Sequence, residues 1–272
     1  MLWRRVLLAG AAALLGVCAA AGAQDAKQIV RQAVHTELAA DAADHTHWLY
    51  YEVDRKPGAN VEQWVAEANK GELKRLLKKN GVSVSSAAQR DGMNRFIQNS
   101  GARAKQRKDN QQDDEQASQM LKMLPDAFLW SKTGEQGNDI ILQFKPNPQF
   151  NPPSWQARVF AAMAGEMKVE KTQHRIVSLK GKMVHDVKFW EGFLGSLHAG
   201  GSFDVERRDT GNGEWQITET HVHIQGHALI FKSISEEEDD VKSQFKQLPD
   251  SISLQNAESL LMKQKGGAHP TG

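Results

Sequence analysis

Apolar residues between positions 26 and 42 recur at three- and four-residue spacings, which place one apolar stripe along a helix. The stripe consists of Ile29, Val30, Ala33, Val34 and Leu38. Alternating runs follow at 46–54, 61–68 and 72–79, with Pro57-Gly58 and Asn80-Gly81 between them. This pattern predicts a helix that packs on a sheet, followed by short antiparallel strands joined by hairpins.

The pattern changes between about 84 and 124. Ser85 or Ser86 is suited to cap a helix, 102–119 is almost wholly polar, and apolar residues return at 120–124 before Pro125. We expect a helical insertion there. Its charged part is typical of a solvated helix or mobile loop, or of a contact surface for a partner or membrane.

Strand-like alternation returns at 127 and continues for about a hundred residues. After two strands and a proline-rich crossover, Ser154 is placed to cap a short helix over 155–163. Six strand-like runs follow without a helix between them, so we expect antiparallel pairing. The runs are 166–170, 175–183, 187–190, 203–207, 215–224 and 228–234. We expect 236–264 to be helical or frayed, and the tail from 251 to 272 to be partly disordered.

The first 23 residues have the pattern of an export signal. Arg4 and Arg5 precede an apolar run over 6–17, and Ala21-Gly22-Ala23 has the small residues that signal peptidase cleaves after. The prediction is a periplasmic mature chain that begins at Gln24.

Two alternatives to a cleaved signal remain open. Cys18 follows a leucine at the spacing of a lipidation site, although Val17 is larger than the small residue normally found before the cysteine. The segment 6–23 is also about the minimum length that spans a bilayer, but it is rich in alanine and glycine.

Composition narrows the function classes. The chain has 34 Lys plus Arg and 33 Asp plus Glu, and loss of Arg4 and Arg5 leaves 32 − 33 = −1. A near-neutral chain lacks the basic surface that nucleic-acid binding requires, so no nucleic-acid partner is expected. Cys18 is the only cysteine, so the mature chain would have no disulfide and no thiolate nucleophile. We expect one domain over 24–250, containing the insertion at about 84–124.

The stretch Gly165-Glu166-Met167-Lys168-Val169-Glu170-Lys171-Thr172-Gln173-His174-Arg175-Ile176-Val177-Ser178-Leu179 resembles a hairpin of the LolA-like proteins. These are exported bacterial proteins that sort lipoproteins to the outer membrane. The proline-rich segments 144–148 and 152–154 and the later run 226–232 are similar to the same group. The resemblance covers about 127–235 best, and it describes a strand order, not a reactive site.

The resemblance implies an α+β fold, in which helices cover the concave face of a strongly curved, unclosed antiparallel sheet. It also implies a periplasmic carrier or binding protein for a lipid or lipidated protein, without a cofactor and with transient membrane contact. We expect a monomer that holds an acyl chain in an apolar cavity. No residue here matches the cargo-gating arginine of the lipoprotein carrier.

Aromatic and methionine side chains are the candidates for lining such a cavity, because they adapt to lipophilic ligands. They suit an ordinary packed core equally well. The candidates are Trp48, Tyr50, Trp64, Met93, Met120, Met123, Trp130, Phe144, Phe160, Met167, Trp190 and Phe203.

Histidines offer the only candidate chemistry. His221 and His223 share one face of a strand and His227 follows, so a zinc ion could bind all three. A solvent-facing stripe explains them as well, and we expect no metal. The sequence has no HExxH, GxSxG or P-loop motif. The expectation is a non-enzymatic carrier. The alternatives are an envelope structural or interaction protein that acts through the charged insertion, and an exported hydrolase.

Overall fold

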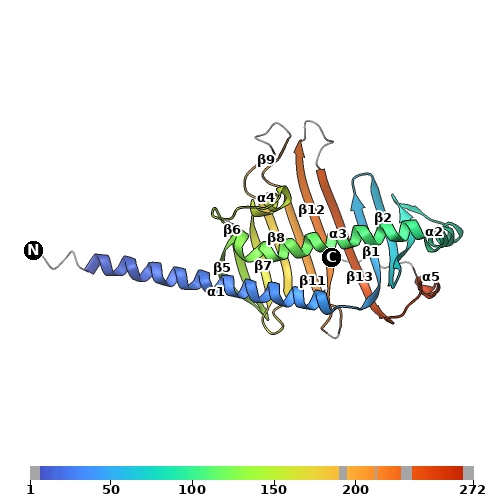
Figure 1. The fold of residues 1–272 in the computed structure, drawn as a ribbon, viewed down its shortest axis with the longest axis horizontal. Helices are drawn as coiled ribbons and strands as arrows, with labels where there is room; N and C mark the ends of the chain where they lie inside the picture. Colours follow the sequence, from blue (N-terminus) through green and yellow to red (C-terminus); the bar gives the residue numbers. More distant parts are fainter. Residues whose placement is uncertain (1–6, 190–194, 212, 228–234, 266–272) are drawn as a thin grey trace, which may run out of the picture.

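The computed structural model describes residues 7–189, 195–211, 213–227 and 235–265. It is an α+β protein built on one large antiparallel sheet that does not close (Figure 1). The predicted strand at 228–234 and the candidate residue Trp190 lie outside the described residues.

The helices and strands follow the predicted order over most of the chain. The helices are α1 (Leu7–Ala43), α2 (Ser86–Gln98), α3 (Ser100–Ala127), α4 (Trp155–Ala161) and α5 (Leu254–Lys263). The strands before α4 are β1 (His47–Lys56), β2 (Ala59–Ala68), β3 (Gly71–Lys79), β4 (Val82–Ser83), β5 (Phe128–Gln136) and β6 (Asp139–Pro146). Those after it are β7 (Met163–Glu170), β8 (Ile176–Met183), β9 (Val187–Phe189), β10 (Gly195–Leu197), β11 (Ser202–Asp209), β12 (Trp215–His227) and β13 (Ser235–Leu248).

Eleven strands form the main path in the order β4-β3-β2-β1-β13-β12-β11-β8-β7-β6-β5. β10 pairs with β12 and with β9 beside this path. The expectation of a helical or frayed segment from 236 is wrong over its first half, because these residues form β13 between β1 and β12. The acidic run alternates between the two faces of the sheet, where neighbouring strands supply partners for its carboxylates.

One face, here called the inner face, carries the larger core. Its β5–β8 end packs against α1 and the C-terminal part of α3, with Val30, Leu124, Phe144 and Met167 all buried in one cluster. The register runs Phe144–Gly165–Gly181–Phe203–Val222 across five strands, so these positions share the inner face.

The opposite, outer face carries a second core at the β1–β3 end. Tyr51, Trp64 and Leu73 are buried there under Met93 of α2 and Leu261 of α5. Helices therefore pack on both faces of the sheet, with α2 and α5 on the outer one.

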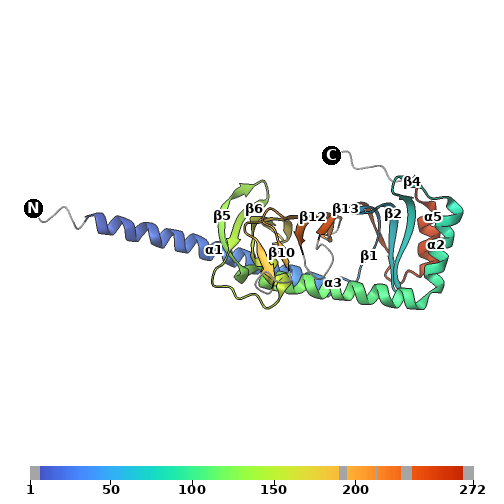
Figure 2. The same ribbon diagram turned by 90° about the horizontal axis from the view of Figure 1, so that it is seen from above.

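Caps define where the insertion helices begin. Ser85 and Asn99 accept hydrogen bonds from the backbone N–H groups of Ala88 and Ala102, as expected of N-cap side chains. α3 then crosses the molecule, packing on β3 and on β5 (Figure 2). The N-terminal part of α1 projects away from the sheet (Figure 1). Among the described residues, no helix is both long and apolar enough to cross a membrane.

Candidate functional site

Six candidate cavity residues converge on the inner face under α1 and α3. Trp130, Phe144 and Met167 are buried, whereas Met123, Phe160 and Phe203 are only partly buried at the margin of the same cluster. Phe128 organises the aromatic part, with ring centroids 4.6 Å from Phe144 and 5.0 Å from Phe160. This apolar cluster joins α1, α3 and α4 to the sheet.

The other candidates lie elsewhere. Trp48 and Tyr50 are buried around Phe245 on the inner face, further along the sheet. Trp64 and Met93 belong to the outer core, because Trp64 pairs with Tyr51 and so points away from Tyr50. Met120 is half-buried on α3.

Charged side chains occupy the inner face between these apolar regions. Lys242 Nζ lies 3.2 Å from Asp240 Oδ2 and 5.6 Å from the centroid of the Tyr50 ring. Glu52 is paired with Lys242 in the register and accepts a hydrogen bond from Gln63. The centre of the inner face is therefore polar, in contrast to its β5–β8 end.

Burial shifts the pKa values of these groups. It raises the pKa of Glu67 to about 7 and that of Asp240 to about 6, against the opposing effects of the Trp48 N–H and of Lys242. Burial alone would lower the pKa of Lys242, but Asp240 and Glu52 raise it. One oxygen of Asp54 and one of Asp240 are buried without a hydrogen-bond partner. The folded chain therefore binds protons at these groups more tightly than the unfolded chain does, so protonation stabilises the fold.

A buried ion-pair network fixes the C-terminal part of α1 to the sheet. Glu37 accepts from Nε and Nη2 of Arg175, from the backbone N–H of Ile176, and also pairs with Arg207. Burial opposes ionisation of Glu37, but Arg207 and Arg175 hold its pKa below the usual value. No local pattern predicts this contact, because Glu37 and Arg175 are 138 positions apart.

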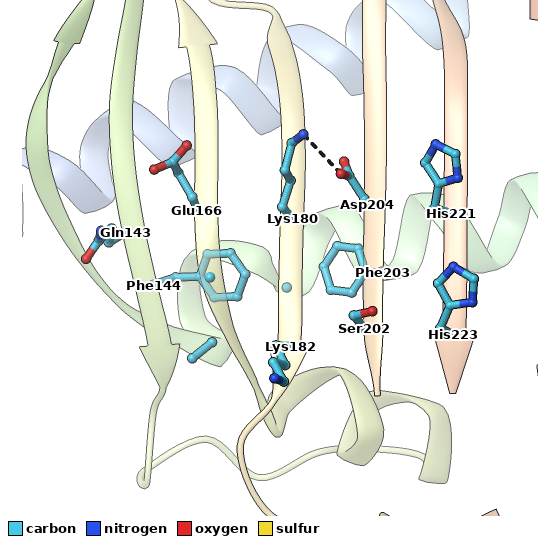
Figure 3. Close-up of a pocket in the computed structure, with 13 residues that line it drawn as sticks. Gln143, Phe144, Glu166, Lys180, Lys182, Ser202, Phe203, Asp204, His221 and His223 are labelled. Carbon is cyan, nitrogen blue, oxygen red and sulfur yellow. Dashed lines mark ion pairs between the residues drawn. The ribbon is translucent and has the colours of Figure 1, made fainter. Parts of the chain in front are cut away.

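A hollow of about 740 Å³ lies on the outer face, across β6, β7, β8, β11 and β12 (Figure 3). Its charged lining includes Glu166, Lys180, Asp204 and His221, and Lys180 Nζ lies 3.0 Å from Asp204 Oδ2. Phe144 and Phe203 reach it from the inner-face row. The hollow therefore shares Phe144 and Phe203 with the apolar cluster, although its charged lining lies on the outer face.

His221 and His223 meet on this outer face, as their spacing predicts. His221 Nδ1 lies 2.6 Å and His223 Nε2 3.4 Å from the same Asp239 oxygen, and the hydrogen bond to Asp239 raises the pKa of His221. The part of the chain with defined placement contains no grouping of three or more ligands suited to a metal ion. The side chain of His227 lies outside the described residues.

A second hollow, of about 760 Å³, lies between the turn that joins β2 to β3 and the polar part of α3. Its lining is polar, with Glu72 bonded to Asn110 at 2.6 Å and Gln106 bonded to the Glu72 backbone. The insertion helix is thus attached to the sheet edge through polar contacts.

His221 bonds the Asp239 carboxylate, and the Asp240 and Glu52 carboxylates of the inner face pair with Lys242 and accept from Gln63, respectively. No protein-family model, curated protein or solved structure matches the chain.

Proposed function

We propose that this protein is a non-enzymatic periplasmic carrier or binding protein for a lipid or lipidated protein, of the LolA-like type. It is exported by the signal in residues 1–23 and acts as a monomer without a cofactor. α1 and α3 cover the concave face of the sheet, and an acyl chain binds between these helices and the β5–β8 end.

One observation carries the proposal: half of the candidate residues gather where α1 and α3 meet an unclosed antiparallel sheet. The cluster has a tightly buried centre and a partly buried margin that includes Leu121, Met123 and Phe160. Flexible methionine and aromatic side chains at such a margin separate at low cost to admit a chain. Binding energy would then come from apolar area removed from water.

Native mass spectrometry of the protein recovered after export tests the proposal, together with displacement of a fluorescent fatty acid. Co-purified lipid and displacement of the probe are expected. Replacing Leu121 and Met123 by arginine should weaken probe binding at least about tenfold, since charges would enter the apolar margin. Lys122→Ala, on the exposed side of the same helical turn, is the matched control. Absence of both lipid and probe binding would overturn the proposal.

A second candidate function rests on the exposed part of α3. Lys105, Lys108, Asp113 and Glu115 are all exposed. This surface suits an envelope protein partner recognised through charge. Reversing the charges of Lys105 and Lys108 should abolish capture of such a partner while probe binding stays intact. Unchanged capture would remove this candidate.

A further inference from the structure

Exposed apolar side chains gather at one end of the sheet. Among the described residues, five large hydrophobic side chains are exposed, and three of them lie at the start of β5, the start of α4 and the end of β8. These are Leu129, Trp155 and Val184, which are 44%, 49% and 52% exposed. We call them the apolar rim. Val184 donates its N–H to the carbonyl of Ala162, directly after α4, and Figure 1 shows α4 and β9 at this same end.

Basic side chains surround the apolar rim. Lys145 is the cross-strand partner of Leu129, Lys182 lies two residues before Val184, and Arg158 donates to the carbonyl of Lys188 at 3.5 Å. The four cationic side chains, those of Lys145, Arg158, Lys182 and Lys188, are all exposed. The predicted mature chain has almost no net charge, so this group of four cations is a local feature of its surface.

Asp186, two residues after Val184 in the sequence, already has partners of its own. Asp186 accepts a hydrogen bond of 2.8 Å from the backbone N–H of Ala199 and lies 3.8 Å from Nδ1 of His198. Asp126, close to the start of β5, is paired with Lys27 at 2.6 Å. The charge presented beside the apolar rim is therefore positive.

We propose that the apolar rim and its four cations form a docking surface for an anionic phospholipid bilayer. Tryptophan favours the membrane–water interface, and long basic side chains reach lipid phosphates while apolar neighbours enter the acyl boundary. The inference rests on the proposed function in one respect: a lipid carrier must meet a bilayer to load or unload.

Vesicle binding tests the surface directly. The protein is exported with its own leader, its N-terminus is determined by mass spectrometry, and it is mixed with phosphatidylcholine vesicles with or without about one-third phosphatidylglycerol. We expect at least about tenfold stronger binding to the anionic vesicles, and weaker binding as salt is raised. Equal binding to both vesicles, or none to either, would overturn the inference.

Two sets of variants separate the apolar and basic contributions. Trp155→Ser with Val184→Ser should reduce binding to anionic vesicles about tenfold, whereas Ile217→Ser, at an exposed apolar position remote from the rim, should not. Neutralising Lys145, Lys182 and Lys188 with glutamine should remove most of the preference for anionic lipid. The matched control neutralises three lysines of α3 in the same way, namely Lys105, Lys108 and Lys122.

The outcomes distinguish this inference from the proposed function. Variants that lose vesicle binding but still displace the fatty-acid probe support the docking surface on an intact carrier. Vesicle binding without any probe binding removes the carrier function and leaves the surface standing. Unchanged vesicle binding in both variant sets overturns the surface. Far-ultraviolet circular dichroism checks folding, and the salt and lipid dependence of the native protein remains decisive if a variant fails to fold.

Discussion

Glu37 of α1 and Arg175, the residue before β8, form a two-point ion pair in which Nε and Nη2 lie 3.1 and 3.0 Å from the two carboxylate oxygens. Both side chains are buried, and Arg207 approaches the same carboxylate. This contact joins the first helix to the sheet directly beside Val34 and Ile176 of the apolar cluster. The position of α1 therefore depends on charge as well as on packing.

Replacing Glu37 by glutamine should destabilise the fold by about 3–5 kcal/mol, because the buried guanidinium of Arg175 and the partly buried one of Arg207 lose their counter-charge. Urea unfolding followed by circular dichroism measures the change. Asp126→Asn is the control, since it breaks an exposed ion pair to α1 and should barely move the midpoint. Similar small effects for both variants would show that the buried network does not hold α1.

Stability should fall as pH rises from 5 to 8. The pKa of Glu67 is raised from 4.5 to about 7 and that of Asp240 from 3.8 to about 6, so the folded chain binds these protons more tightly than the unfolded chain. The stabilisation is present at low pH and is lost as pH rises through 6–7, on the order of 2–3 kcal/mol for Glu67. Urea midpoints at several pH values measure it.

Glu67→Gln should flatten this dependence and raise the midpoint at pH 8, whereas Asp250→Asn, at an exposed position, should leave the slope unchanged. A residual slope is expected, because the raised pKa of His221 also gives stabilisation that declines as pH rises. A midpoint of Glu67→Gln that follows the native pH profile would contradict the assignment.

Gly181→Ala should destabilise the sheet by about 1–3 kcal/mol, because a Cβ at this position would overlap the Phe203 ring. Phe203→Leu should recover part of the loss, which a double-mutant cycle measures as a coupling energy. Gly134→Ala is the control, since nothing lies within 4 Å of its added Cβ. Strict additivity of the two substitutions would exclude the predicted contact.

Leu261→Ala in α5 should cost about 2–5 kcal/mol, because the side chain is fully buried in the outer core against β2 and β3. Leu129→Ala, which truncates an exposed leucine, should stay within about 0.5 kcal/mol of the native protein. Thermal or urea unfolding of both variants gives the comparison. A mild effect at Leu261 would indicate that α5 is not part of the cooperative unit.

Periodicity predicted much of the fold. The stripe of α1, the hairpins of β1–β3, the caps at Ser85 and Ser154 and the antiparallel order after α4 all follow from local patterns. β13 was missed because its acidic run resembles a solvated segment. Asp239 meets His221 only once β13 is paired with β12, whereas Asp240 pairs on the opposite face with Lys242 of its own strand.

The sequence proposes cavity residues by their type, but it does not place them in space. The sequence alone does not reveal that Trp64 lies opposite Tyr51, and that register determines which face each aromatic side chain occupies. The charged centre of the inner face also depends on pairing between distant strands, as with Glu52 and Lys242. Such long-range contacts leave no local pattern in the chain.

β13 joins the two halves of the main sheet, with β1 on one side and β12 on the other. β13 follows both of these neighbours in the chain, so β1 and β12 are synthesised before the strand that joins them. A chain that stops before 235 would hold two separate sheet fragments with open edges, each prone to pair wrongly. Completion of the C-terminal region is therefore the step that commits this protein to its folded state.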